Sequence, residues 1–478
     1  MTPSLRSAVL ARLHRLYDDV VPLLSGDDPS ATEDARASLA EPLRLAVVGR
    51  VSSGKSTLVN ALVGRRIAPT SAGECTRVVT WYRFGAPDRA DLELVDGSMR
   101  PVRLAGQGLP NELDVPAEKV SRLVVHLASG PLRDLTLIDT PGLDTLTAAN
   151  DAATRRAILG AGKASQRAAG AADALLFLIG DAARRSDVDF LADFRASAGR
   201  QSATALNAVG LLAQADRFGS GPFDPRDPFD VAREVAQGLA TTHRAELADV
   251  LPVSGLLAET ARTGRISESL ARRVADLAGE EVLALSLRRQ DPALQDLYRF
   301  FGPYGVGAGR DQAANGAARL KSWCQEVSGI ADLENVVRSR LVPRADLLKA
   351  NRALGVLATA AGRADDAEKA LALVETATFD PDLHPLQELR ALHALTSEVP
   401  GSPLVAQLSR FVDDPDPVAL LGIEAGGPDE LALAARRRSA EATRTAALAV
   451  FPAEADAGRV LARSYQLLAR RLRSDAGG

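Results

Sequence analysis

The sequence predicts an α/β domain followed by an all-helical half. Up to about residue 258, short apolar runs alternate with helical stretches, a pattern typical of a mostly parallel sheet with helices on both faces. Beyond that point the runs stop, and leucine and alanine recur at helical spacing. The chain has 478 residues, enough for two or three domains. The expected strands are 43–48, 78–84, 92–95, 123–127, 135–138, 174–179, 208–212 and 250–253.

The flanking segments are expected to be helical. Leucine and valine recur every three or four residues over 5–24, which predicts one amphipathic helix. Residues 25–42 are rich in Asp, Ser and Pro and are expected to form a linker. Residues 347–374 are expected to form one long helix. The chain should therefore divide into an N-terminal helix and linker at 1–42, an α/β domain at 43–342 and a helical domain at 343–478, with the first helix packed against the C-terminal helices.

Composition excludes several classes of protein. The 57 basic and 61 acidic residues give a net charge of -4, which leaves no global positive field for nucleic acid. The two cysteines, Cys75 and Cys324, lie too far apart in sequence to indicate a disulfide framework or a metal cluster. No apolar run approaches the roughly 20 residues that a membrane span needs. We therefore expect a cytoplasmic protein that meets a membrane, if at all, from its surface.

The strongest motif follows the first strand. Residues 49–56 read GxxxxGKS between an apolar strand and a helix start, the context of a phosphate-binding loop. Backbone N–H groups line such a loop and the helix adds its positive dipole end. Lys55 would bridge the β- and γ-phosphates, and the Ser56 hydroxyl would bind Mg²⁺. Lys55 is also one of only six lysines, and the alternative, a glycine turn with a solvated lysine, is weak in this context.

A second motif, DTPG, ends the strand at 135–138. Asp139 there can hold the Mg²⁺ shell through water, and the Gly142 N–H can contact a γ-phosphate. Between the two motifs, residues 67–77 suit a mobile loop whose Thr76 reaches Mg²⁺ only in the triphosphate state. An ordinary threonine entering the next strand is the alternative for Thr76.

Base recognition is expected at the end of the strand at 208–212. Asp216 can accept both the N1–H and the 2-amino hydrogens of guanine, which adenine cannot offer. The loop at Ser254 and Gly255 could present backbone N–H groups to the guanine carbonyl. A helix cap is the alternative role for Asp216.

Together these motifs resemble the translation-factor class of GTPases. The wide gap between the phosphate loop and DTPG, the segment from Pro69 to Thr76 and the helical second half resemble the bacterial dynamin-like large GTPases. Residues 328–349 are similar to the actinobacterial isoniazid-inducible type. In compact GTPases the final helix follows the Ser254-type loop and often opens with Ser-Gly-Ile. Here that opening appears at Ser328, so 258–327 is expected to be a helical insertion within the GTPase domain.

The resemblance implies a P-loop GTPase domain with a helical neck and stalk, which hydrolyses GTP to GDP and phosphate with Mg²⁺. The catalytic residues are expected to be Lys55, Ser52 and Thr76, and the metal site to be Ser56, Thr76 and Asp139. The residues expected to bind the nucleotide are Gly49, Arg50, Val51, Ser52, Ser53, Gly54, Lys55, Ser56, Thr57, Asp139, Gly142, Gln214, Asp216, Ser254 and Gly255.

Three parts of the family pattern are altered. Leu143 stands where Ras-like enzymes place a water-orienting Gln, and Val51 where eukaryotic dynamins carry Gln. Slow basal turnover is therefore expected, with dimerisation across the nucleotide faces able to supply a missing group. The resemblance also implies that a monovalent cation could bind near Ser52. Residues 213–216 read AQAD in place of [N/T]KxD, so a bracing hydrogen bond should be lost and guanine affinity should be modest.

Three functions stay open from the sequence. The first is a dynamin-like GTPase in membrane remodelling or maintenance, acting as a homodimer. The second is a regulatory GTP-binding subunit that pairs with a paralogous GTPase. The third is a P-loop ATPase. A C-terminal arginine surface leaves peripheral contact with the anionic inner face of the cell membrane open, against a plain solvated surface as the alternative. These arginines are Arg436, Arg437, Arg438, Arg459, Arg463, Arg470, Arg471 and Arg473.

Overall fold

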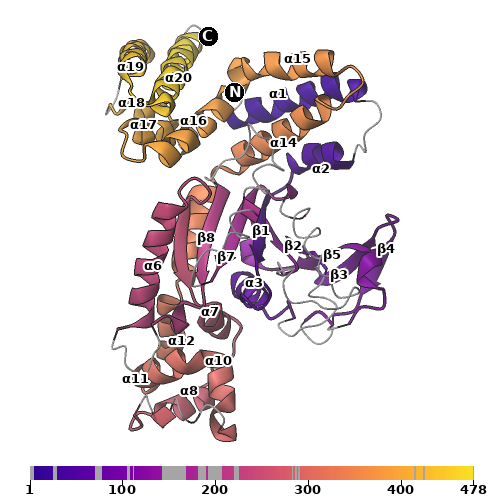
Figure 1. Ribbon diagram of the computed structural model, residues 1–478, viewed down its shortest axis with the longest axis vertical. Coiled ribbons are helices and arrows are strands. Elements are labelled where there is room, and N and C mark those ends of the chain that lie inside the picture. Colours follow the sequence, from indigo (N-terminus) through magenta and orange to yellow (C-terminus); the bar gives the residue numbers. More distant parts are fainter. Residues whose placement is uncertain are drawn as a thin grey trace.

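A mixed sheet lies at the centre of the molecule (Figure 1). The computed structural model describes residues 5–24, 30–69, 78–104, 108–110, 112–142, 168, 170–180, 190–191, 207–219, 226–281, 284–285, 288, 291–413, 416–423 and 426–476. Within these residues the strands are β1 (Leu43–Gly49), β2 (Thr80–Phe84), β3 (Arg89–Leu94), β4 (Met99–Val102), β5 (Val120–Leu127), β6 (Leu135–Asp139), β7 (Ala174–Ile179), β8 (Ala208–Ala213) and β9 (Asp249–Val253).

The strand order is β4-β3-β5-β2-β6-β1-β7-β8-β9. β6, β1, β7, β8 and β9 run parallel, β2 is parallel to β5 but antiparallel to β6, and β3 is antiparallel to both β4 and β5. The expected α/β fold with a mostly parallel sheet is confirmed. β4 was not expected, because its sequence Met-Arg-Pro-Val has no apolar run. It forms the exposed edge of the sheet, where a proline is tolerated.

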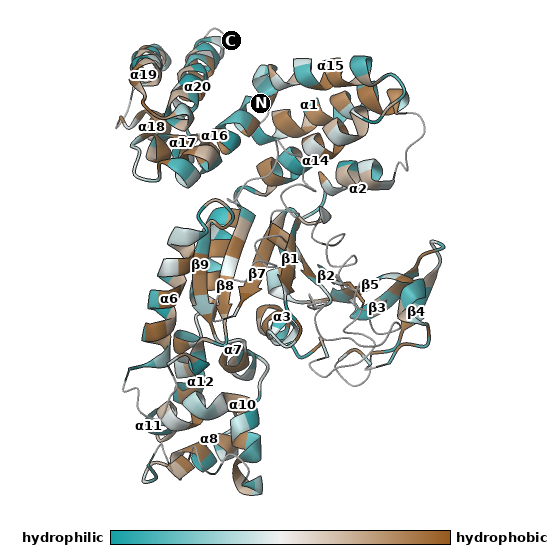
Figure 2. Ribbon diagram, in the orientation of Figure 1, coloured by the Kyte–Doolittle hydropathy of each residue, from teal (hydrophilic) through white to brown (hydrophobic). Residues whose placement is uncertain are grey.

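The two faces of the sheet belong to two hydrophobic cores. In β1, Leu45 and Val47 join one core, whereas Ala46 and Val48 join the other, as the two-residue period of a strand requires. Helix α3 (Lys55–Val63) covers the first face and α6 (Pro228–Thr242) covers the second. Apolar residues accordingly gather on the central strands β1, β7 and β8 (Figure 2).

Helices occupy both ends of the molecule (Figure 1). α1 (Leu5–Val20) lies against α14 (Ala345–Ala361) and α15 (Ala367–Thr378), and the Tyr17 hydroxyl donates to the Ala353 carbonyl at 2.8 Å. The chain continues through α16 (His384–Glu398), α17 (Leu404–Asp413), α18 (Pro417–Leu421), α19 (Pro428–Leu448) and α20 (Pro452–Ala476). None of the helices in the described residues is both long and apolar enough to cross a membrane.

The other group of helices lies between β9 and α13 (Ile330–Val336). It consists of α7 (Gly255–Arg262), α8 (Glu268–Ala275), α10 (Pro292–Ala308), α11 (Arg310–Ala313) and α12 (Ala317–Val327). The chain returns to the end of β9 at Ser328, whose carbonyl accepts a hydrogen bond from the Ser254 N–H at 2.9 Å. The segment expected to be an insertion therefore leaves and rejoins the sheet at neighbouring points. The division into domains stays a prediction.

Two expectations about helices were wrong. Residues 30–38 of the expected linker form helix α2 (Ser30–Ser38), which packs against α14. The expected long helix over 347–374 is two helices, α14 and α15, which pack against each other. The Asp366 side chain caps the second by accepting from the Lys369 N–H. One apolar stripe spans both helices because both face the same core.

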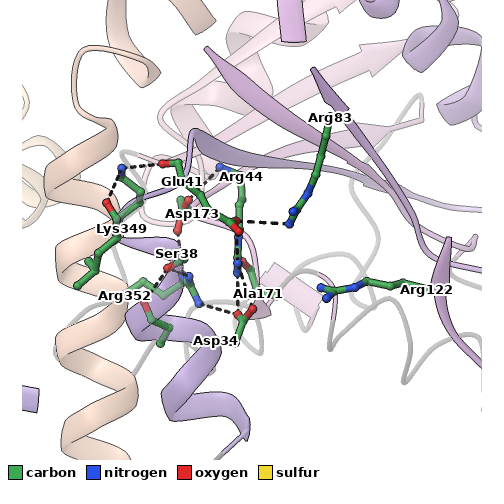
Figure 3. A network of polar contacts seen from close by, with 12 residues as sticks. Asp34, Ser38, Glu41, Arg44, Arg83, Arg122, Ala171, Asp173, Lys349 and Arg352 are labelled. Atoms are coloured by element: carbon green, nitrogen blue, oxygen red, sulfur yellow. Dashed lines mark hydrogen bonds and ion pairs between the residues drawn. The ribbon is translucent and has the colours of Figure 1, made fainter. Parts of the chain in front are cut away.

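A buried ionic network joins the sheet to α2 and α14 (Figure 3). Asp173, just before β7, is fully buried and accepts from the Arg44 N–H of β1 and from the Arg352 side chain of α14, each at 2.9 Å. Arg44 makes a bidentate pair with Asp34 of α2 at 2.6 and 3.0 Å. Lys349 of α14 donates to the carbonyls of residues 39 and 41. The N-terminal segment is thus held between the sheet and the C-terminal half.

Replacing Arg352 with Met should lower the free energy of unfolding by about 3 kcal/mol. Removing one partner of a buried ion pair leaves Asp173 charged and uncompensated. Urea unfolding followed by circular dichroism would measure the change. Arg363→Met, in the exposed turn that follows the same helix, is the control and should change stability by less than about 0.5 kcal/mol. Equal effects of the two variants would contradict the assigned role of the network.

Candidate functional site

The phosphate loop connects β1 to α3, as the sequence predicts. The Lys55 ammonium is buried and donates to the carbonyls of Gly49 at 3.0 Å and Arg50 at 2.7 Å. Ser52 has a φ of 60°, an uncommon value for a residue other than glycine. The loop therefore curls around the lysine side chain, which holds its positive charge inside the turn.

Asp139 faces this loop from the end of β6. Parallel pairing aligns Val47 of β1 with Asp139, and the Thr140 hydroxyl donates to the Val47 carbonyl at 2.9 Å. The Ser56 hydroxyl donates to Asp139 Oδ2 at 3.2 Å, whereas Asp139 Oδ1 is buried without a hydrogen-bond partner. Burial raises the pKa of Asp139 to about 6, although Lys55 and the Ser56 hydrogen bond oppose this shift.

These side chains fit a magnesium ion. The orphaned Asp139 Oδ1 and the Ser56 hydroxyl are hard oxygen donors of the kind that Mg²⁺ prefers. A cation here would neutralise the buried carboxylate and satisfy its unpaired oxygen. Within the described ranges, this site included, no group of three or more His, Cys, Asp or Glu side chains is placed to hold a metal.

Gly142 and Val51 bring the two phosphate-facing motifs into contact. A Cβ atom on Gly142 would lie 2.4 Å from Val51 Cγ2 and 2.8 Å from the Val51 N atom. Any larger residue than glycine at position 142 would therefore push the loops apart. The Val51 side chain is itself 54% exposed, an apolar group at the mouth of the phosphate loop.

A second part of the site is a pocket of about 200 Å³ beside the phosphate loop. Asp216 lies in its wall, directly after β8. Burial raises the pKa of Asp216, and a hydrogen bond with Ser254 opposes this shift. The lining residues are Ser53, Gly54, Thr57, Leu58, Leu178, Leu211, Ala213, Gln214, Asp216, Arg217, Val253, Gly255 and Leu256. A buried acceptor beside apolar walls suits a flat heterocycle that carries N–H donors.

A hydrogen bond from Gln214, and not from the position of the missing Asn, links the base motif to the phosphate loop. Gln214 adopts a φ of 58°, and its Nε2 donates to the Ser52 carbonyl at 3.2 Å. Its Oε1 accepts from Arg217 at 2.7 Å. The side chain of the second motif residue therefore ties the pocket to the phosphate loop in place of the missing Asn.

Ser254 closes the pocket from behind. It is fully buried, its N–H donates to the Ser328 carbonyl, and its hydroxyl accepts from the Leu257 N–H at the start of α7. Its own N–H is thus already paired within the protein. Gly255 lines the pocket and Ser254 supports it, so a direct contact of Ser254 with a base stays a prediction.

The structure brings most of the predicted residues together around one loop. The phosphate loop, Asp139 and Gly142 form one end of the site, and Gln214, Asp216 and Gly255 form the other. Thr76 and Leu143 lie outside the described residues, as does Cys75. Sequence reasoning missed the hydrogen bond between the Gln214 side chain and Ser52. It depends on the left-handed backbone conformation of Gln214, which the sequence does not reveal.

Replacing Asp139 with Asn should stabilise the nucleotide-free protein more at pH 7.5 than at pH 5. The native pKa of about 6 lies above the value near 4 of an unfolded chain, so the native state takes up a proton as pH falls through 6. Wild-type stability should therefore rise by about 1 kcal/mol from pH 7.5 to 5, and the Asn variant lacks this gain.

Unfolding free energies at the two pH values would test this. Asp134→Asn, which changes an exposed carboxylate on the loop before β6, controls for general effects of charge. An advantage of the Asn variant that grows toward pH 5 would contradict the expected sign.

Comparison with known proteins agrees with these motifs. The family model of the dynamin family matches residues 45–202. The isoniazid-induced protein IniC of Mycobacterium tuberculosis is 33% identical over 458 residues, 88% of this chain and 90% of the relative. The bacterial dynamin-like protein of Nostoc punctiforme is 27% identical over 123 residues, 23% of this chain and 18% of that protein.

Among solved structures, an oligomerised bacterial dynamin pair aligns with 99% of this chain and 74% of its own chain. The identity is 12% and the TM-score 0.32, too low to inform the site. The sequence match to IniC, by contrast, runs along nearly the whole of both chains. On that similarity, together with the phosphate loop and DTPG motifs, this chain belongs to the dynamin family, as a bacterial dynamin-like GTPase.

Proposed function

We propose that the protein binds GTP with Mg²⁺, hydrolyses it slowly and uses nucleotide-dependent pairing to move its helical half. The observation that carries this proposal is the convergence of Lys55, Ser56 and Asp139 beside a phosphate loop whose Ser53 and Gly54 also line the Asp216 pocket. The two ends suit the phosphates and the base of one nucleotide.

Each residue has a chemical role in this proposal. The triphosphate oxygens take the place of the Gly49 and Arg50 carbonyls as partners of the Lys55 ammonium. Ser56 and Asp139 would hold Mg²⁺, which would supply positive charge to the phosphates, and Thr76 would join them in the triphosphate state. Asp216 accepts the N1–H and 2-amino hydrogens of guanine, which favours GTP over ATP.

Slow turnover and pairing both follow from Val51. A valine cannot orient the attacking water, so Ser52, Thr76 and backbone groups remain for that task. Because Val51 is 54% exposed at the loop's mouth, a second subunit that covered it would bury apolar surface and exclude water from the site. We propose pairing across the nucleotide faces, with a monovalent cation near Ser52 as a further element.

The same valine favours a second candidate function. A phosphate loop without a water-orienting side chain also suits a regulatory GTP-binding subunit that pairs with a paralogous GTPase. The two candidates differ in whether the chain alone turns over GTP.

Turnover measured against protein concentration separates these functions. We expect the specific GTPase rate to rise with protein concentration, and Lys55→Ala to lower GTP affinity at least about 100-fold, because two or more charge-assisted hydrogen bonds are lost. Lys321→Ala, on the exposed surface of α12, is the control and should change neither. GTP binding without turnover would favour the regulatory subunit. Equal competition by ATP would favour an ATPase.

Membrane contact is proposed at the turn between α19 and α20. Leu448, Val450 and Phe451 are exposed there by 81%, 85% and 50%. Exposed apolar groups at one turn suit shallow insertion among lipid headgroups. Arg436, Arg437 and Arg470 are exposed on the same two helices and would attract anionic lipid, whereas Arg438 and Arg459 pair with neighbouring carboxylates.

Co-sedimentation with anionic vesicles tests this contact. The double variant Val450→Ser and Phe451→Ser should lower vesicle binding at least about tenfold, because burial of two large apolar side chains is lost. The control changes Val95 and Met99 to Ser, which removes two side chains that are 71% and 56% exposed at the far edge of the sheet. If wild-type protein never sediments with vesicles, with or without a GTP analogue, the proposed contact is wrong and the GTPase proposal stands.

A further inference from the structure

Helix α10 contains a sharp break at Gly302. The residue has φ 64° and ψ 177°, values outside any helix, and Pro303 follows it. The break divides the segment with the densest aromatic content in the chain. It belongs to the helical segment between β9 and α13, which the GTPase motifs do not include.

The break lies against the base pocket. A Cβ atom on Gly302 would be 3.4 Å from Asp216 Oδ2 and 3.5 Å from Leu256 Cδ2. Both Asp216 and Leu256 line the pocket, whereas Gly302 does not. The kink therefore lies beside the wall of the pocket, next to the carboxylate proposed to recognise the base, with room for little more than one added carbon between them.

The kink is fixed from both sides. Before it, the Phe300 carbonyl accepts from the Thr260 hydroxyl of α7 at 2.5 Å, and Phe301 is fully buried. After it, the Tyr304 hydroxyl donates to Asp227, the residue that caps α6, at 2.9 Å, and the ring stacks on Trp323. α10 thus cannot shift without moving α7, which begins beside the pocket.

Asp216 is buried beside this kink. Its side chain is largely removed from solvent, which raises its pKa, and its hydrogen-bond partner in the protein is Ser254. A desolvated carboxylate gains most from donors that replace its lost water, and guanine brings two of them. A small displacement of the carboxylate would therefore weaken the binding of guanine. It would have little effect on the binding of a base that lacks those donors.

We infer that the α10 kink positions the Asp216 carboxylate for guanine, so that the helical insertion is part of base recognition. Gly302 and Thr260 are positioning residues that act through Asp216. The inference rests on the proposed GTP binding and adds the element that compensates for the degenerate AQAD motif.

Calorimetric titration with GDP and with inosine diphosphate tests the inference. Inosine lacks only the 2-amino group, so the ratio of the two affinities reports the contact with Asp216. Wild type should prefer GDP about tenfold or more, as a charge-assisted hydrogen bond implies. Gly302→Ala places a Cβ against Asp216 at a strained φ and should lower that ratio at least about threefold, mainly by weakening GDP.

Gly316→Ala is the matched control. Gly316 also belongs to the insertion and has φ 88°, and a Cβ there would lie 3.5 Å from the Glu268 carboxylate instead of Asp216. It carries the same kind of backbone strain and should keep the wild-type ratio. Thr260→Val, which removes the hydroxyl that holds the Phe300 carbonyl, is a second variant should Gly302→Ala fail to fold.

The outcomes separate the inference from the function on which it rests. A wild-type ratio near one would overturn both guanine recognition by Asp216 and the inference. A clear wild-type preference that Gly302→Ala and Thr260→Val both leave intact would overturn the inference alone. An equal loss of the preference in Gly316→Ala would show general loosening of the insertion and would also overturn it.

Discussion

The fully buried Asp173 carboxylate is the interaction on which the rest of the structure depends. It accepts hydrogen bonds from the Arg44 N–H of β1 and from the Arg352 side chain of α14. The Asp173 N–H in turn donates to the Arg44 carbonyl. One side chain thus fixes where β1 and β7 begin and where the helical half attaches. A charge at this depth is tolerable only with both partners present, so sheet and helices must assemble together.

Because β1 and β7 are fixed at this end, their opposite ends are placed as well. β1 runs to the phosphate loop and lies between β6, which ends in Asp139, and β7. The strands are short, central and apolar on both faces. Because they are closely packed, a displacement at one end is expected to move the other end as well. The attachment of α14 and the phosphate loop therefore lie at the two ends of the same strands. On the proposed function, a shift of α14 relative to the sheet would couple the nucleotide state to the helical half.

Sequence patterns predicted the parts of the site that are built from residues close together in the sequence or at the ends of paired strands. The strand, loop and helix around Lys55, and Asp139 at a strand end, depend on neighbouring residues and on parallel pairing, so motif and spacing were sufficient. What sequence reasoning missed depends on contacts between distant segments. The hydrophobic pattern of helix α2 is too short to predict a helix. Its position depends on hydrogen bonds from Arg44 and Arg352, which lie in distant segments. The approach of Gly302 to Asp216 joins residues that no motif relates.

The degenerate base motif illustrates how structure redistributes a function among residues. The brace that an Asn would provide comes from Gln214, which reaches Ser52 because its backbone adopts a left-handed turn. On our inference, a helix outside the compact GTPase core positions Asp216. Each replacement depends on a neighbour that an isolated motif cannot show. Loss of a motif residue therefore indicates that the base is supported differently. It does not by itself indicate lost specificity, since Asp216, the carboxylate proposed to recognise guanine, is retained.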